Sequence, residues 1–169
     1  MIIVSDFNNT LEIDREIDPE LFSYLLAMAL GGHKVAIFSG NPDQARDHVH
    51  ALARNKEAID PLIEAIKARN PAIGQEADEV RADLFGEGLI HIDSKLNLNK
   101  WLEGRKIHIG FDDEPHGSAI NTLSCHHVID RHSDEYDHFM IAVKEHGAEQ
   151  ASSALVTPRN PPADPAPGM

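Results

Sequence analysis

The feature that most constrains the fold is a regular alternation of short apolar runs and helical stretches. Five apolar runs recur along the chain: MIIVS, KVAIFS, GLIHID, KIHIGF and HHVID. Strands that alternate with helices require right-handed crossovers, which make the strands parallel and cover both faces of one sheet with helices. The order of elements therefore predicts an α/β protein with a three-layer, Rossmann-like parallel sheet. Ligands of such sheets bind beyond the carboxyl ends of the strands.

The stretches between the apolar runs carry signals for helix starts. A capping residue followed by proline is typical of a first helical turn. This pair begins each of three expected helices, at Asp18–Pro19, Asn41–Pro42 and Asp60–Pro61. Further helices are expected over GQEADEVRADLFG, NLNKWLEG and DEYDHFMIAVKEHG.

The chain length of 169 residues, with 41% hydrophobic residues, predicts one domain with an ordinary core. We expect this domain to span residues 1–149. Residues 150–169 include the proline-dense stretch TPRNPPADPAPGM, which predicts a disordered tail. The segment from Leu11 to Pro19 is too short to hold a second folded unit, so no large cap domain is expected. An open site of this kind suits bulky substrates or a second subunit that acts as a lid.

A formal net charge of −13 limits the partners of the chain. Such a surface repels phosphate backbones, so nucleic acids and anionic membranes are disfavoured. A small anionic substrate stays compatible, because one metal ion can invert the local charge. No apolar run approaches the ~18 residues of a membrane-spanning helix, and Asp6 interrupts the N-terminal run, so we expect a cytoplasmic protein. The single cysteine, Cys125, excludes an internal disulfide and is expected to be a small buried strand residue rather than a nucleophile.

Polar residues stand where four of the expected strands end: Asp6-Phe7-Asn8-Asn9-Thr10-Leu11, Ser39-Gly40, Asp93-Ser94-Lys95 and Asp112-Asp113. Carboxylate and carbonyl oxygens hold Mg²⁺, a hydroxyl and a lysine neutralise phosphoryl oxygens, and a carboxylate can attack phosphorus. The set therefore indicates phosphoryl transfer to an aspartate. Structural alternatives remain: a polar turn at Asn8-Asn9, and a helix N-cap at Asp112-Asp113.

These strand ends resemble the motifs of the haloacid dehalogenase-like (HAD) superfamily, in the same order and over roughly residues 1–130. IIVSDFNNTL resembles the first motif, an apolar strand followed by D-x-D-x-T-L. VAIFSG is similar to the second motif, and FDDEP to the paired-aspartate form of the fourth. Lys95 is a candidate for the lysine of the third.

The resemblance implies a nucleophile and a magnesium site. Asp6 would form an aspartyl-phosphate and also bind Mg²⁺. Asn8 would bind the metal through its backbone carbonyl, and Asp112 through its carboxylate. Asp113 would act through a water or orient the lysine.

The resemblance also implies residues that hold a phosphorylated substrate. Thr10 would support the turn after the first strand, and Ser39 would donate a hydrogen bond to the phosphoryl group beside the backbone turn at Gly40. Lys95 would pair with Asp6 and the phosphoryl oxygens, with Lys100 as the alternative because the spacing of this motif is loose.

One position departs from the pattern of the family's phosphatases. The residue two after the nucleophile is normally an aspartate that serves as general acid and base, and here it is Asn8. An amide cannot give up or take a proton as a catalyst near neutral pH, whereas a carboxyl can, and losing such a group typically costs about 10²–10⁴ in rate. Three interpretations stay open: an enzyme of low activity whose leaving group needs no proton or takes one from a residue such as His116; a catalytically inactive binding or regulatory module; or an engineered residue.

Two competing interpretations are weaker. Receiver domains of two-component signalling carry their acidic pair after the first strand, whereas here the pair follows the fourth. A histidine metal site is disfavoured because His48 and His50 cannot face the same way on a helix, and His126 and His127 alternate across a strand.

Overall fold

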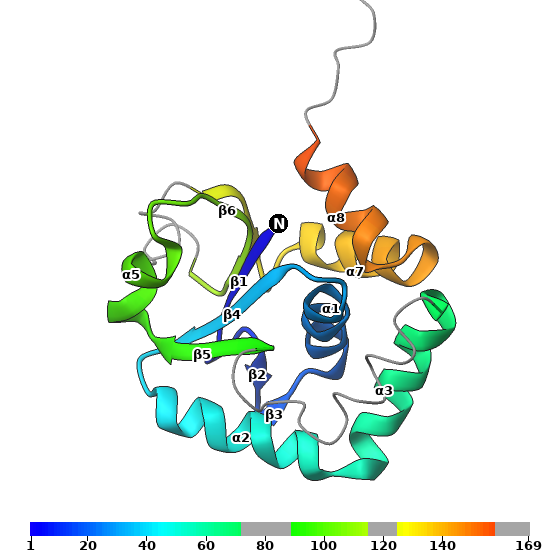
Figure 1. Cartoon of the computed structure of the whole chain (residues 1–169), viewed down its shortest axis with the longest axis horizontal. Helices are drawn as coiled ribbons and strands as arrows, with labels where there is room; N and C mark the ends of the chain where they lie inside the picture. The colour runs from blue at the N-terminus through cyan, green and yellow to red at the C-terminus, as the bar shows by residue number, and fades with distance from the viewer. Residues whose placement is uncertain (72–88, 115–124, 158–169) are drawn as a thin grey trace, which may run out of the picture.

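The structure is a computed structural model that describes residues 1–71, 89–114 and 125–157. Its centre is a five-stranded sheet in which every neighbouring pair of strands is parallel (Figure 1). The strand order is β5 (Ile90–Ser94), β4 (Lys34–Ser39), β1 (Ile2–Asp6), β6 (Ile107–Asp112) and β7 (Cys125–Asp130). Each strand overlaps one of the five apolar runs, so the prediction of an α/β fold with a parallel sheet is confirmed.

Helices cover both faces of this sheet, which gives the three-layer, Rossmann-like arrangement (Figure 1). The larger layer holds α1 (Pro19–Leu30), α2 (Pro42–Arg54), α3 (Lys56–Arg69), α7 (Asp134–His146) and α8 (Ala148–Val156). The described part of the opposite layer holds the short helix α5 (Leu98–Leu102).

Successive side chains of a strand point to opposite faces of the sheet, and this alternation divides the core into two apolar clusters. Ile3 of β1 and Ile37 of β4 face the larger helical layer. Val4 and Phe38, their neighbours along the chain, face α5. Because both faces of a parallel sheet are covered, its strands are apolar throughout, and β1 is buried along its whole length.

The capping signals predicted two helix starts correctly and one wrongly. The side chain of Asp18 accepts from the backbone N–H of Glu20 at the start of α1, and Asn41 caps α2 in the same way. The start at Asp60 is wrong, because α3 begins at Lys56 and contains Pro61 inside it. The expected helix at residues 74–86 lies outside the described residues.

Helix α8 moves the boundary of the domain beyond the expected residue 149. Ser152 is buried, and its hydroxyl lies 2.7 Å from the hydroxyl of Tyr24 in α1. At the start of α8, Glu149 lies 2.6 Å from the imidazole of His33. The ordered domain therefore reaches Thr157, and the expectation of a tail that begins at residue 150 is wrong for 150–157. Residues 158–169 lie outside the described ones.

A small antiparallel hairpin follows β1 after a short turn at residues 7–11. Its strands, β2 (Glu12–Ile13) and β3 (Glu16–Ile17), are joined through Asp14 and Arg15, which both have positive φ angles. The turn at residues 7–11 and this hairpin make up the whole insertion between β1 and α1, and the described residues contain no separate folded unit above Asp6. Among those residues, no helix combines the length and the apolar character needed to cross a membrane.

Candidate functional site

The parallel sheet brings the polar strand ends to one edge. Asp6 is the register partner of Phe38, the residue before Ser39 of β4. On the other side, the register of β1 and β6 places Asp6 level with Asp112. Residues that are far apart in the sequence therefore meet at the carboxyl edge of the three central strands.

Asp6 is the centre of this edge. Its side chain is buried, with 3% of the residue exposed. One carboxylate oxygen lies 2.9 Å from the ammonium of Lys95, and the other accepts from the hydroxyl of Thr10 at 3.3 Å. Lys95 is therefore the lysine that reaches Asp6, whereas Lys100 is an exposed residue of α5.

Three carboxylates gather beside this lysine. Oxygen atoms of Asp6, Asp112 and Asp113 all lie within 4.8 Å of one another. With one ammonium against them, the cluster has a net charge of −2 when every group is ionised. Such a concentration of buried negative charge is unfavourable unless a cation or protons neutralise it.

Asp112 provides the observation that tests whether a cation fits. Asp112 is 1% exposed, and its Oδ1 accepts from the backbone N–H of Glu114 at 3.0 Å. Its Oδ2 is buried and has no hydrogen-bond partner among the described residues. A buried carboxylate oxygen without a partner costs free energy, and a hard divalent cation bound by oxygen ligands would remove that cost. The donor set therefore fits Mg²⁺.

The neighbouring charges and burial shift the pKa values of Asp6 and Lys95. Burial raises the pKa of Asp6 to about 7, and the nearby carboxyls of Asp113 and Asp112 add to the rise. The ammonium of Lys95 acts in the opposite direction. Burial alone would lower the pKa of Lys95, but the facing carboxylates raise it above its ordinary value. Lys95 thus stays charged, and Asp6 binds a proton near neutral pH in the absence of a cation.

Ser39 lies at the end of β4, with its side chain buried. Its oxygen accepts from the backbone N–H of Asn41 at 3.0 Å. Because the oxygen is already used as an acceptor, the hydroxyl proton remains for an anionic oxygen in front of the edge. Gly40 follows in the turn before α2, where a Cβ atom would meet no other atom within 4 Å. A lack of room for a side chain therefore does not explain the glycine at this position.

Asn8 lies in the turn after β1, where its side chain is exposed. Its backbone forms a bridge to Glu12, and Asn9 after it has a φ angle of 58°. Asparagine tolerates this left-handed region better than most residues. The polar-turn interpretation is therefore confirmed for Asn8 and Asn9, whereas binding of Mg²⁺ by the Asn8 carbonyl stays a prediction. His116, the suggested proton donor, lies outside the described residues.

Asp93 has a structural role and lies outside the acidic cluster. Its carboxylate accepts from the backbone N–H of Ser94 at 2.7 Å and from the amide of Asn97 at 2.9 Å. Although partial burial acts in the opposite direction, these hydrogen bonds and His91 lower the pKa of Asp93. Asp93 therefore stabilises the short 3₁₀ helix η2 (Lys95–Asn97), which carries Lys95.

The other polar candidates have separate partners. His48 of α2 contacts Glu12 of the hairpin, and His127 lies 3.1 Å from Glu135. Within the described ranges, the acidic cluster is the one group of side chains placed to hold a metal. Cys125 is a strand residue as expected but is only half-buried, and burial raises the pKa of its thiol.

Arg131 and His132 belong to the same edge, and sequence reasoning missed them. Arg131 donates to the backbone carbonyl of Thr10 at 3.0 Å, and His132 contacts the carbonyl of Asn9 at 3.0 Å. The one available signal was their place after the strand HHVID, since every strand of a parallel sheet ends at this edge.

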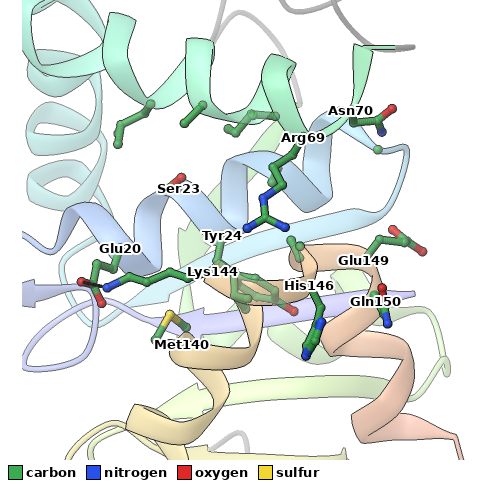
Figure 2. A pocket seen from close by; sticks show the side chains of 18 of the residues that line it. Glu20, Ser23, Tyr24, Arg69, Asn70, Met140, Lys144, His146, Glu149 and Gln150 are labelled. Atoms are coloured by element: carbon green, nitrogen blue, oxygen red, sulfur yellow. Dashed lines mark hydrogen bonds and ion pairs between the residues drawn. The ribbon is translucent and has the colours of Figure 1, made fainter.

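A separate cavity of about 950 Å³ lies among α1, α3, α7 and α8 (Figure 2). Its walls are mostly apolar and include Tyr24. An ion pair of 2.8 Å joins Glu20 and Lys144 at its rim, and Arg69 donates to the Glu145 carbonyl at 3.1 Å. No residue of the acidic cluster lines this cavity, so it is distinct from the site at the strand ends.

No protein-family model matches the chain, and neither a curated protein nor a solved structure matches it. The class that the structure establishes is an α/β protein with a parallel sheet and helices on both faces. The resemblance to the HAD superfamily therefore depends on the four strand ends.

Proposed function

We propose that this chain is a HAD-like, Mg²⁺-dependent phosphohydrolase or phosphotransferase that acts through an aspartyl-phosphate on Asp6. The observation that supports it most is the arrangement around Asp6. The carboxylate lies 2.9 Å from Lys95 and shares a cluster with Asp112, whose buried Oδ2 has no partner among the described residues. In a cluster that only stabilised the fold, a buried oxygen of this kind would have a hydrogen-bond partner.

The residues that would hold the cation are Asp6, Asp112 and the backbone carbonyl of Asn8, with Asp113 beside them. The cation would neutralise negative charge on the carboxylates and on the phosphoryl oxygens. It would also favour the ionised form of Asp6, the form that can attack.

The chain's own residues supply the remaining chemistry. One carboxylate oxygen of Asp6 attacks phosphorus, and the bond from phosphorus to the leaving oxygen breaks. Lys95 and the Ser39 hydroxyl stabilise the charge on the phosphoryl oxygens. In the second step, water or an acceptor hydroxyl attacks phosphorus, and the carboxylate of Asp6 is released.

Proton transfer is the step that this chain supports poorly. The leaving oxygen takes up a proton in the first step, and the attacking water loses one in the second. The amide of Asn8 can do neither, so we propose a low rate. The same amide at Asn8 supports a second candidate, a binding or regulatory module that holds a phosphorylated ligand without turnover.

A phosphatase assay on Asn8→Asp beside the unchanged chain separates the two candidates, with Asp6→Asn as the blank. If the machinery is present, Asn8→Asp gains about 10²-fold or more. The gain should be larger for alkyl phosphates than for p-nitrophenyl phosphate, because the nitrophenolate leaves without needing a proton. If both proteins match the blank on every ester, the catalytic proposal is wrong.

A further inference from the structure

Arg131, the residue after β7, joins three parts of the carboxyl edge. Its backbone N–H donates to the carbonyl of Asp112 at 2.9 Å, so the main chain of Arg131 lies beside a member of the acidic cluster. Its Nε donates to the Thr10 carbonyl at 3.0 Å, and its Nη2 donates to Asp18 at 2.7 Å. Thr10 belongs to the turn after β1, and Asp18 caps α1. Arg131 thus connects the end of β6 through its backbone with this turn and the start of α1 through its side chain.

The Asp18 end of this connection is firmly held. The guanidinium of Arg131 lies 4.1 Å from the ring centre of Tyr136, whose hydroxyl donates to the same Asp18 oxygen at 2.9 Å. Burial and then the Asp18 carboxylate raise the pKa of Tyr136, so the phenol keeps its proton and remains a donor. The side chains of Arg131 and Asp18 are 17% and 14% exposed. Solvent therefore screens this ion pair less than an exposed one.

The turn is held at two consecutive carbonyls. Arg131 binds the carbonyl of Thr10, and His132 binds the carbonyl of Asn9. The buried hydroxyl of Thr10 lies 3.3 Å from Asp6 and 3.4 Å from Asp113. A shift of the turn would therefore move Thr10 and the adjoining carbonyl of Asn8 relative to the carboxylates.

We infer that Arg131 is a positioning residue that fixes the turn carrying Asn8 relative to Asp112, and thereby sets the geometry of the cation site. The inference rests on the proposed function, because it assumes that this cluster binds Mg²⁺. Mg²⁺ demands near-ideal octahedral geometry, so ligands on two separate strand ends must be held in register. Residues that orient metal ligands typically contribute about 10–100-fold to metal affinity.

Two substitutions test this positioning role. In Arg131→Lys, the single ammonium can still pair with Asp18 but cannot donate to Thr10 at the same time. In Asp18→Asn, the amide oxygen can keep the cap of α1, but the NH₂ group replaces the oxygen that accepts from Arg131 and Tyr136, so the anchor of Arg131 is lost. Arg105→Lys is the matched control, because the Nε of Arg105 also donates to a backbone carbonyl, that of Leu102, at 2.9 Å.

Calorimetry with Mg²⁺ and hydrogen exchange of the amides of Leu11 and Glu12 are the readouts. Both amides donate to the carbonyl of Phe7 within the turn, at 3.0 and 2.9 Å. We expect Arg131→Lys to lose about 10-fold or more in Mg²⁺ affinity and to exchange these amides faster, with little change in its unfolding temperature. Asp18→Asn should lose affinity as well, because it releases Arg131, and should also unfold at a lower temperature; Arg105→Lys should change neither affinity nor exchange.

The outcomes are distinguishable from failure of the proposed function. Wild-type affinity in Arg131→Lys overturns the inference, whether or not exchange becomes faster. If the unchanged chain binds no Mg²⁺ at all, the proposed function and the cation site fail together. Faster exchange in Arg131→Lys alone would then still show that Arg131 holds the turn.

Discussion

Lys95 and Asp6 form an ion pair of 2.9 Å across the end of β4, the strand that separates theirs in the sheet. Lys95 can span this width because η2 starts directly after β5 and Ser94 caps it. The pair supplies the one positive charge that the described structure sets against the acidic cluster. Lys95 therefore influences both the charge of Asp6 and the charge that an anionic ligand would meet at this edge.

Replacing Lys95 tests this double role. In the Asn8→Asp background, Lys95→Met should lower kcat by about 10²-fold or more, because a charge that stabilises the transition state is lost. A steady-state phosphatase assay measures the effect. Lys100→Met is the matched control and should keep the activity, since Lys100 is exposed on α5. Equal losses in the two variants would contradict the assignment of Lys95.

Binding of Mg²⁺ should depend on pH near neutrality. Since burial raises the pKa of Asp6 to about 7, protons compete with the cation at a higher pH than for an ordinary carboxylate. Titration calorimetry should show affinity falling about tenfold per pH unit below about 7. Asp112→Ala should bind weakly at every pH. A constant affinity between pH 7 and 5 would rule out Asp6 as a ligand.

Without a divalent cation, Asp6 should make the folded protein less stable as pH rises. The pKa of Asp6 is 3.8 in the unfolded chain and about 7 in the folded one. Its contribution is therefore fully present below pH 3.8 and is lost as the pH rises through about 7. Compared with Asp6→Asn, the unchanged chain should lose about 1–3 kcal/mol of unfolding free energy between pH 5 and pH 8.

Urea unfolding in the presence of a chelator measures this difference. Parallel pH profiles for Asp6→Asn and the unchanged chain would mean that the pKa of Asp6 is not raised. At pH 8 without Mg²⁺, Asp6→Asn should be the more stable of the two proteins. Saturating Mg²⁺ should make the unchanged chain the more stable one, because the cation stabilises only the protein that keeps the ligand.

Helix α8 should be needed for a stable domain. A chain that ends at residue 149 loses Ser152 and leaves the buried hydroxyl of Tyr24 without that partner. We expect a loss of about 2–4 kcal/mol in unfolding free energy from the lost hydrogen bond and the exposed apolar surface. A chain that ends at residue 157 is the control and should unfold at the same temperature as the full chain. Equal thermal unfolding of all three chains would show that α8 contributes little.

The main sheet was predictable because its signals are local. Each apolar run became a strand, and the Asp–Pro and Asn–Pro pairs at Asp18 and Asn41 marked true helix starts. The same signal failed at Asp60, since α3 begins at Lys56 and packs Ile59 and Ile63 into the core on both sides of Pro61. Tertiary packing thus outweighed a local preference.

Other features have no local signal. The strands β2 and β3 are two residues each, and their turn uses Asp14 and Arg15 in place of glycine. Helix α8 has few large apolar residues, and its buried Ser152 is held by a hydrogen bond with Tyr24. The gathering of acids at the edge was predictable from the strand ends, whereas the contact from Arg131 to Thr10 depends on the three-dimensional fold.

The position of β1 in the middle of the sheet affects when the site can form. The neighbours of β1 are β4, which follows soon in the chain, and β6, which begins only at Ile107. During synthesis the N-terminal part emerges first, so Asp6 and Ser39 can be in place while Asp112 and Asp113 have not yet been made. A nascent chain therefore has no complete acidic cluster until most of the domain has left the ribosome. Asp6, which is synthesised long before Asp112 and Asp113, has its complete surroundings only when almost all of the sheet has assembled around it.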